Sequence, residues 1–296
     1  MNRNSFDCIT TGRVIINGDD FGMSPGVNAA IKRLHRAGRL TSTSIMTNMP
    51  WSPDALAYAD QAADLRSGVH LNLTTGRPLL PSEEVPTLVD HSGQFLPLSL
   101  LLSRLVAGRV NRDELRHEME AQIEAALEVF QVSPATKIDH LDSHMHFHAV
   151  PALGRLVSDL AIRYGVPAVR NPDFGAFVTP PPTEIGPVRT ALQKAGARVL
   201  VSTQKALARK NIVLNDPPAA TRQLVYLRWC LEPGPNPPAE TFRSCLCDLE
   251  GGNLEIIAHP AEIDDVLPTF SGYVDGRQME LEFLVSDEFA EMLETM

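Results

Sequence analysis

The chain has 296 residues, of which 44% are apolar and 21% charged, so it can bury a core large enough for one α/β domain of barrel size. Its 26 basic and 36 acidic residues give a net charge of −10 without a basic run, which argues against a nucleic-acid backbone or an anionic membrane as the main partner. A neutral or cationic small molecule suits this charge better. No apolar run approaches ~18 residues, and Met1–Thr11 lacks the apolar core of a signal peptide, so we expect a cytoplasmic protein without a membrane span.

Four cysteines occur in the chain, and their number and uneven spacing do not suit a disulfide framework. Cys245 and Cys247 lack the second thiol pair that a structural zinc site needs. We therefore expect Cys8, Cys230, Cys245 and Cys247 to be reduced, and none lies in a motif typical of a nucleophile. A serine hydrolase is disfavoured, and the phosphate-binding pattern Gly-x-x-x-x-Gly-Lys does not occur.

Strand-like and helix-like runs alternate from the N-terminus onward. The apolar run Val14–Ile16 predicts a first strand, which leads into Asn17-Gly18-Asp19-Asp20. Ser24 and Pro25 then open a helix with apolar residues at helical spacing, which ends before Gly38. These two elements predict one β-α unit.

The same alternation continues along the rest of the chain. Further strands are predicted at Ser44–Thr47, Val69–Thr74, Ile138–Leu141, Ala168–Arg170, Val199–Val201 and Leu254–Ala258. A long helix is predicted after Asn111, with Glu114 as in a capping arrangement and apolar residues at helical spacing up to Phe130. Successive β-α units favour a single domain, residues 1–296, with a parallel sheet that is open or closed into a barrel.

A histidine-rich segment at residues 138–148 holds four of the nine histidines of the chain and two aspartates. In an extended segment, side chains at alternate positions share one face, here those of His140, Asp142, His144, His146 and His148. Imidazole and carboxylate groups are the usual ligands of zinc and similar divalent ions. We therefore interpret this segment as part of a metal site. A solvated polar loop is the alternative interpretation.

Polar residues also fall at the carboxyl ends of several predicted strands, where α/β folds place their sites. These residues are Asp19, Asp20, His70, Asn72, His144, Arg170 and His259. Taken singly, they are also consistent with a polar turn, with hydrogen-bonded core histidines and, for Arg170, with a surface ion pair. Taken together, they predict one site at the carboxyl ends of the strands.

Five segments in order resemble the signatures of the YdjC-like carbohydrate deacetylases, a family that includes chitooligosaccharide deacetylases and a deacetylase associated with hopanoid biosynthesis. The segments are residues 17–22, 40–44, 68–74, 142–148 and 258–260. The resemblance runs from about residue 13 to residue 285 and is weakest over 175–250. It implies a seven-stranded (β/α) barrel, one divalent metal ion, Mg²⁺ or Zn²⁺, and hydrolysis of an N-acetyl group on an amino sugar.

Carried over to this chain, the family pattern makes Asp20, His70 and His144 the metal ligands. It makes Asp19 the general base and His259 the general acid. The residues alone do not decide which histidine of the His-x-His-x-His run binds metal; the family pattern implies the first.

By the same mapping, His146 and His148 surround the ligands or line the pocket. We assign Asn72, His146 and Arg170 to substrate binding. The partner is then a small amino-sugar substrate, with its identity open and a homodimer left open.

Two other classes of function remain. A metal-dependent phosphoesterase or amidohydrolase on a related barrel also uses His-x-His, although amidohydrolase-type sites usually place that pair on the first strand, where this chain has Asp19 and Asp20. A non-catalytic sugar-binding module would not need a carboxylate beside a metal-binding aspartate and a histidine opposite. Release of acetate from N-acetylated sugars separates a deacetylase from the latter.

Overall fold

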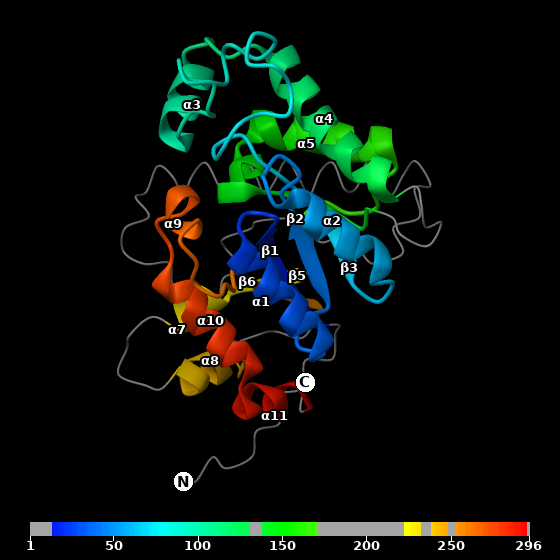
Figure 1. Cartoon of the computed structure of the whole chain (residues 1–296), viewed down its shortest axis with the longest axis vertical. Helices are drawn as coiled ribbons and strands as arrows, with labels where there is room; N and C mark the ends of the chain where they lie inside the picture. Colours follow the sequence, from blue (N-terminus) through cyan, green and yellow to red (C-terminus); the bar gives the residue numbers. More distant parts are fainter. Residues whose placement is uncertain (1–13, 131–137, 171–221, 232–237, 248–252, 295–296) are drawn as a thin grey trace.

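The computed structural model describes residues 14–130, 138–170, 222–231, 238–247 and 253–294. These residues form an α/β fold around a parallel sheet of six strands in the order β4-β3-β2-β1-β6-β5 (Figure 1). The strands are β1 (Val14–Phe21), β2 (Ser42–Ile45), β3 (Arg66–Leu71), β4 (Leu141–Ser143), β5 (Arg222–Tyr226) and β6 (Asn253–Ala258). Among the described residues, no helix is long and apolar enough to cross a membrane.

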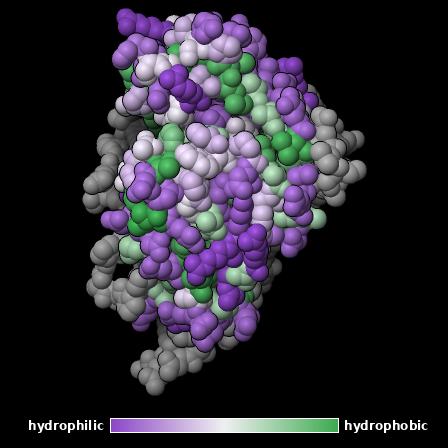
Figure 2. Space-filling view, viewed as in Figure 1, coloured by the Kyte–Doolittle hydropathy of each residue, from purple (hydrophilic) through white to green (hydrophobic). Residues whose placement is uncertain are grey.

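Helices cover the sheet, with α1 on β1, α4 on β3 and α7 on β6. The helices are α1 (Pro25–Arg36), α2 (Ser52–Gln61), α3 (Leu98–Val106), α4 (Arg112–Phe130), α5 (Pro151–Tyr164), α7 (Leu227–Leu231), α8 (Pro238–Cys247), α9 (Leu267–Phe270), α10 (Asp275–Val285) and α11 (Asp287–Glu294), together with the 3₁₀ helix η1 (His144–Ala149). In Figure 1, α3 and α4 lie at one end of the molecule and α8 and α11 at the other. The face shown in Figure 2 is mostly hydrophilic, with apolar residues in small separate patches.

The first β-α unit forms as predicted, but its strand is longer than the apolar run. β1 continues through Asn17, Asp19 and Asp20, which are buried like the residues before them. Helix α1 begins at Pro25, and the Ser24 hydroxyl accepts a hydrogen bond from Val27 N at 3.2 Å. A buried strand that ends in carboxylates is unfavourable unless they are paired, so β1 itself points to a charged site.

Helix α4 begins after Asn111, whose Oδ1 accepts from Asp113 N at 2.9 Å. The predicted capping by Glu114 is wrong. Its Oε2 instead accepts from Thr87 N at 2.8 Å and from Thr87 Oγ1 at 2.7 Å, in the segment that follows β3. A tertiary contact therefore replaces the local one.

Two further polar residues of α4 hold the same segment by its backbone. The carboxylate oxygens of Glu118 each accept a hydrogen bond at 3.0 Å, one from Leu79 N and one from Leu80 N. The Gln122 amide binds both backbone groups of Asn72, its N at 2.8 Å and its O at 2.7 Å. Buried polar groups of this kind are stable only when hydrogen-bonded, and here they fix the loop beside β3.

The sheet extends past β4 by a single parallel bridge between Leu141 and Val169, inside the predicted strand Ala168–Arg170. The predicted strand Val199–Val201 lies outside the described residues. The described part of the chain therefore confirms a parallel α/β sheet of six strands, and a closed barrel of seven stays a prediction. Cys230 is buried and not in a disulfide, as expected, and its thiol donates to Tyr226 O at 3.6 Å.

Candidate metal and catalytic site

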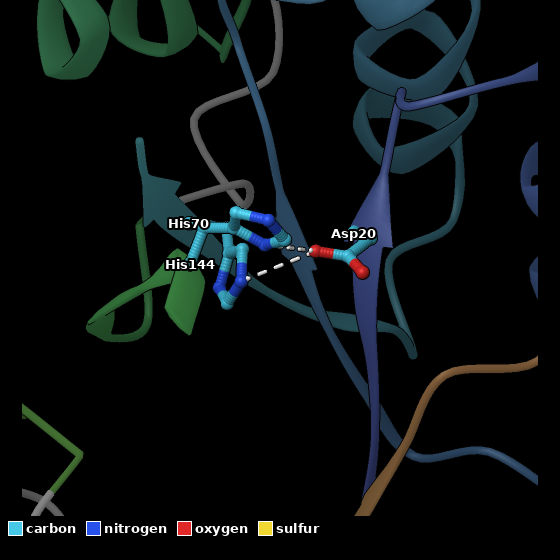
Figure 3. Close-up of side chains that lie close together, drawn as sticks. All are labelled: Asp20, His70 and His144. Atoms are coloured by element: carbon cyan, nitrogen blue, oxygen red, sulfur yellow. Dashed lines mark hydrogen bonds and ion pairs between the residues drawn. The ribbon is translucent and has the colours of Figure 1, made fainter. Parts of the chain in front are cut away.

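Three side chains from different strands meet at the carboxyl edge of the sheet (Figure 3). Oδ1 of Asp20, at the end of β1, lies 3.4 Å from Nε2 of His70 on β3 and 2.9 Å from Nδ1 of His144 just after β4. One ligand atom from each of the three lies within 4.8 Å of the others. Asp20 and His70 are buried, and His144 is partly exposed. The predicted trio therefore comes together in the fold.

Asp20 adopts a left-handed backbone conformation, with φ of 68°, which is uncommon for a residue other than glycine and often marks a functional site. Burial alone would raise the pKa of its carboxyl group, but the charges of His144 and Arg277 hold that pKa well below its ordinary range. Arg277 donates to Oδ2 at 2.6 Å. Asp20 is therefore an ionised carboxylate whose other oxygen faces the two histidines.

His70 is oriented by Asp142, whose Oδ1 lies 2.7 Å from His70 Nδ1. This contact leaves Nε2 toward Asp20. Burial would lower the pKa of His70, but the charge and hydrogen bond of Asp142 and the charge of Asp19 raise it to about 10. Without a metal ion His70 is thus protonated, and a cation bound at Nε2 would displace that proton.

Asp19 precedes Asp20 on β1, and its Oδ2 lies 4.0 Å from Nε2 of His70 while the carboxylate pairs with Arg170. Two hydrogen bonds of 2.7 and 2.8 Å join the guanidinium to the carboxylate. Burial would raise the pKa of Asp19, but Arg170 and His70 lower it, so Asp19 is ionised. Arg170 also contacts Asp142 at 2.6 Å and Glu255 at 2.8 Å, and it is only 2% exposed.

Asp19, His70 and Asp142 form a second cluster with metal-ligand spacing. Because the Arg170 guanidinium already contacts both of these aspartates, the cluster has its positive partner. In the trio, Arg277 contacts Oδ2 of Asp20 and leaves Oδ1 toward His70 and His144, so the trio is the better candidate for a metal ion.

His259 follows β6 and lies across from the trio. Its Nε2 is 3.9 Å from Oδ2 of Asp19, and its Nδ1 is 3.9 Å from Oε1 of Glu280. Burial lowers the pKa of His259 to about 4, against the opposing charges of Asp19 and Asp20. The imidazole is therefore neutral at neutral pH.

Glu280, on α10, is hydrogen-bonded to the backbone of His259. It accepts a hydrogen bond from the backbone N of His259 at 2.5 Å and another from the Tyr273 hydroxyl at 2.7 Å. Burial raises the pKa of Glu280 to about 7. Glu280 and Arg277 are site residues that sequence reasoning misses, because they sit within a helix and not at a strand end.

The extended conformation predicted for the histidine-rich segment is wrong beyond Ser143. β4 ends there, and within η1 the residues Met145 and His146 lie in the left-handed region, at φ of 56° and 50°. His144, which precedes these two residues, contacts Asp20, while the centroid of the His146 ring lies 5.3 Å from that of Tyr226.

His148 is buried in a different environment from His144. Its ring nitrogens lie 2.5 Å from Ser143 Oγ and 3.0 Å from Arg170 O, so it ties η1 to the neighbouring segment. Asn72 is also buried, and its amide holds the turn after β3 through Thr74 N and Thr75 N, at 3.0 and 3.1 Å. Substrate contacts of Asn72, His146 and Arg170 stay predictions.

Gly22–Gly26 matches the Gly-x-Ser-x-Gly pattern of serine hydrolases, but Ser24 does not sit as a nucleophile. It is buried, caps α1 and donates to Asp264 Oδ2 at 2.8 Å. The serine is a helix cap.

The profile of the family described as YdjC-like protein matches residues 13–295. The chain belongs to the YdjC-like family. The site residues described above all lie within the matched range, so the family match and the geometry refer to the same part of the chain.

Relatives of this YdjC-like chain extend over nearly its whole length. Carbohydrate deacetylases from Thermoanaerobacter pseudethanolicus and Halalkalibacterium halodurans are each 30% identical, covering 95% and 94% of this chain and 93% and 98% of their own. The crystal structure of an Enterococcus faecalis protein, named for cellobiose-phosphate cleavage, superposes with a TM-score of 0.69 at 29% identity, over 96% of this chain and 94% of that one. The similarity therefore covers fold and site together.

Proposed function

We propose that this YdjC-like chain is a carbohydrate deacetylase, a hydrolase that removes the N-acetyl group of an amino sugar with the help of one divalent metal ion. The observation that carries the proposal is the meeting of Asp20, His70 and His144, with Asp19 on one side and His259 opposite. The deacetylase names of the relatives support the reaction. The N-acetylated substrate and the metal are the finer parts of the proposal.

The donor set and the charge of the site both suit a divalent cation. One carboxylate and two imidazoles suit zinc, and they leave positions for other ligands. The buried carboxylates of Asp19, Asp20, Asp142 and Glu255 pair with the guanidinium groups of Arg170 and Arg277. Once an ion has displaced the proton of His70, two negative charges are left over, which a divalent ion would neutralise. When bound, such an ion lowers the pKa of water from ~15.7 towards ~7 and polarises a carbonyl oxygen.

In this proposal Asp19 takes a proton from the attacking water. Arg170 keeps it ionised and fixes both of its oxygens, so it is a general base of defined orientation. The ion pair with Arg170 lowers the pKa of Asp19 and so makes it a weak base. A weak base suits a water molecule whose own pKa has been lowered.

His259 protonates the leaving nitrogen, since an amide anion cannot depart in water. Because burial lowers the pKa of His259 to about 4, the ring needs to gain a proton before it can donate one. Its Nε2 lies 3.9 Å from Asp19 Oδ2, which is beyond hydrogen-bond distance, so in this proposal the proton that Asp19 took from water reaches His259 through a bridging water. The proton thus passes from water to Asp19, to His259 and to the amine, and acetate is the other product.

We also propose that the chain forms one domain, residues 1–296, whose sheet closes into a seven-stranded barrel. The bridge from Leu141 to Val169 supports closure, since it continues the sheet beyond β4. Asn72, His146 and Arg170 act at the substrate side of the site in this proposal.

The test is release of acetate and free amine from N-acetylglucosamine, its short oligomers and glycolipids by protein loaded with Zn²⁺ or Mg²⁺. Asp19→Asn serves as the inactive control, because it keeps the shape of the side chain but removes the base. A protein that releases phosphate from phosphoesters and no acetate from any N-acetyl sugar would instead be a metal-dependent phosphoesterase.

A further inference from the structure

Behind His70, a chain of buried polar side chains leads away from the metal ligands into the interior. Asp142 binds His70 Nδ1 through Oδ1 at 2.7 Å, and its Oδ2 lies 2.7 Å from Ser44 Oγ. Ser44 Oγ in turn lies 3.0 Å from Nε2 of His140. All four residues are at most 7% exposed. The proposed metal site is therefore connected to His140, which does not contact it directly.

This series of polar side chains ends near the amino end of β3. His140 Nδ1 lies 3.5 Å from Asp139 Oδ2, and Arg66, the first residue of β3, holds Asp139 with hydrogen bonds of 3.0 and 2.9 Å. His70 lies near the carboxyl end of the same strand, four residues on or about 13 Å away at ~3.3 Å per residue. The connection thus spans the strand from end to end.

The donors and acceptors available on each side chain determine which group donates in each hydrogen bond. The Ser44 hydroxyl has one proton. Asp142 is paired with the Arg170 guanidinium at 2.6 Å, and its oxygens accept from the groups around it. Ser44 therefore donates to Asp142, and its oxygen accepts from His140 Nε2–H and from Asn17 Nδ2 at 2.9 Å.

At the metal-site end of the series, the same argument determines which ring nitrogen of His70 faces Asp20. Asp142 Oδ1 accepts the proton of His70 Nδ1, so Nε2 is the nitrogen that faces Asp20. We propose that Ser44 and His140 are positioning residues, which act through Asp142 to hold His70 with Nε2 toward the metal. The inference deepens the proposed function, since it rests on the same metal site. Partners of this kind typically change metal affinity or activity ~10-fold to 100-fold.

Gly68 lies against the His140 ring and offers an independent way to displace it. A Cβ on Gly68 would lie 2.4 to 2.6 Å from three atoms of the His140 ring, so the ring occupies the space that a side chain would need. Gly68→Ala should therefore displace His140 while removing no polar group.

The experiment measures Zn²⁺ binding to metal-free protein by calorimetry. We expect Ser44→Ala, His140→Leu and Gly68→Ala each to bind Zn²⁺ roughly 10-fold more weakly or worse. His140→Gln, which can place an amide N–H near the position of Nε2, should restore binding. Ser158→Ala is the matched control, because that buried hydroxyl bonds Gly154 O at 2.8 Å, away from the site, and should leave Zn²⁺ affinity unchanged.

A second measurement reports on His70 itself. Nitrogen-15 spectra of the Zn²⁺-loaded protein identify which ring nitrogen of His70 carries the proton. Wild type should show a slowly exchanging Nδ1 proton, and Ser44→Ala and Gly68→Ala should show faster exchange or a mixture of tautomers. This readout depends on no substrate, so a protein that hydrolyses no N-acetyl sugar but shows these effects retains the inference and loses the proposed function.

Unchanged Zn²⁺ affinity and an unchanged His70 spectrum in Ser44→Ala and Gly68→Ala would overturn the inference. Equal weakening by Leu and Gln at residue 140 would also count against it, since the N–H donor would then be irrelevant. Thermal unfolding of the metal-free variants checks that they fold. If His140→Leu does not, the comparison of Ser44→Ala with Ser158→Ala decides.

Discussion

Nη2 of Arg277 donates to Oδ2 of Asp20 at 2.6 Å, which joins α10 to the end of β1 across most of the sequence. The other oxygen of the carboxylate is thereby left to face His70 and His144. Arg277 is itself buried, and its Nε donates to Tyr273 O at 2.9 Å. A charge from the last third of the chain thus orients a proposed ligand from its beginning.

Arg277→Gln should weaken Zn²⁺ binding by ~10-fold to 100-fold, because Asp20 loses the group that orients and ionises it. Calorimetric titration of metal-free protein measures the effect. Arg243→Gln is the control, since that guanidinium is partly exposed and lies 3.7 Å from Glu288 on the surface. Equal affinities of Arg277→Gln and wild type would show that Asp20 needs no such support.

The paired aspartates should fail in different ways. Asp20→Asn should lose bound metal together with activity, whereas Asp19→Asn should keep the metal and lose roughly 10²-fold to 10⁴-fold in turnover, the usual contribution of a general base. Metal content by elemental analysis, measured beside kcat, separates the two. A metal-free Asp19→Asn and a loaded Asp20→Asn would reverse the assignment.

Three histidines of η1 should respond differently to alanine. His144→Ala should lose metal, because it removes one of three proposed ligands. His146→Ala should retain it. His148→Ala should mainly reduce the free energy of unfolding, by about 1–3 kcal/mol, since it leaves Ser143 Oγ and Arg170 O without their partner. Equal metal loss in all three variants contradicts this view.

His259→Ala should slow hydrolysis of an N-acetyl amide far more than that of an aryl acetate, because only the amide has a poor leaving group. The ratio of the two losses in kcat/KM is the measurement. Equal losses on amide and ester would mean that His259 acts on substrate position or on the fold, and its role as an acid would be withdrawn.

The pH dependence of stability should report on Glu280. Burial raises its pKa from an ordinary 4.5 to about 7, so the folded state binds a proton more tightly than the unfolded state. This contribution is fully present below pH 4.5 and is lost as pH rises through 7. Relative to Glu280→Gln, the metal-free wild type should therefore lose stability across that window and change little above it. A pH-independent difference between the two proteins in urea unfolding would contradict the assignment.

The convergence of Asp19, Asp20, His70 and His259 could be predicted from the sequence, because the carboxyl ends of parallel strands meet at one edge. The positions are confirmed by the fold, while the roles stay predictions. Arg277 and Glu280 could not be predicted in the same way. Each sits on a helix whose angle to the sheet depends on packing across the whole chain, and nothing local marks a helical arginine as buried.

The histidine-rich segment shows a second limit of sequence reasoning. Alternation correctly places His140 and Asp142 on one side, but the segment leaves the strand after Ser143. Met145 and His146 take a left-handed conformation, which is uncommon outside glycine and which the alternating pattern does not predict. Arg170, which a surface ion pair would also have explained, proves to be buried among three carboxylates.

The hydrogen bonds from α4 to the segment after β3 have an evolutionary consequence. Glu118 and Gln122 hold that segment through the backbone of Leu79, Leu80 and Asn72, and backbone groups are common to nearly every amino acid. Side chains in the segment can therefore be exchanged without loss of its anchor. Selection, or a designer, could therefore rewrite the side chains of this segment while the helix that holds it stays the same.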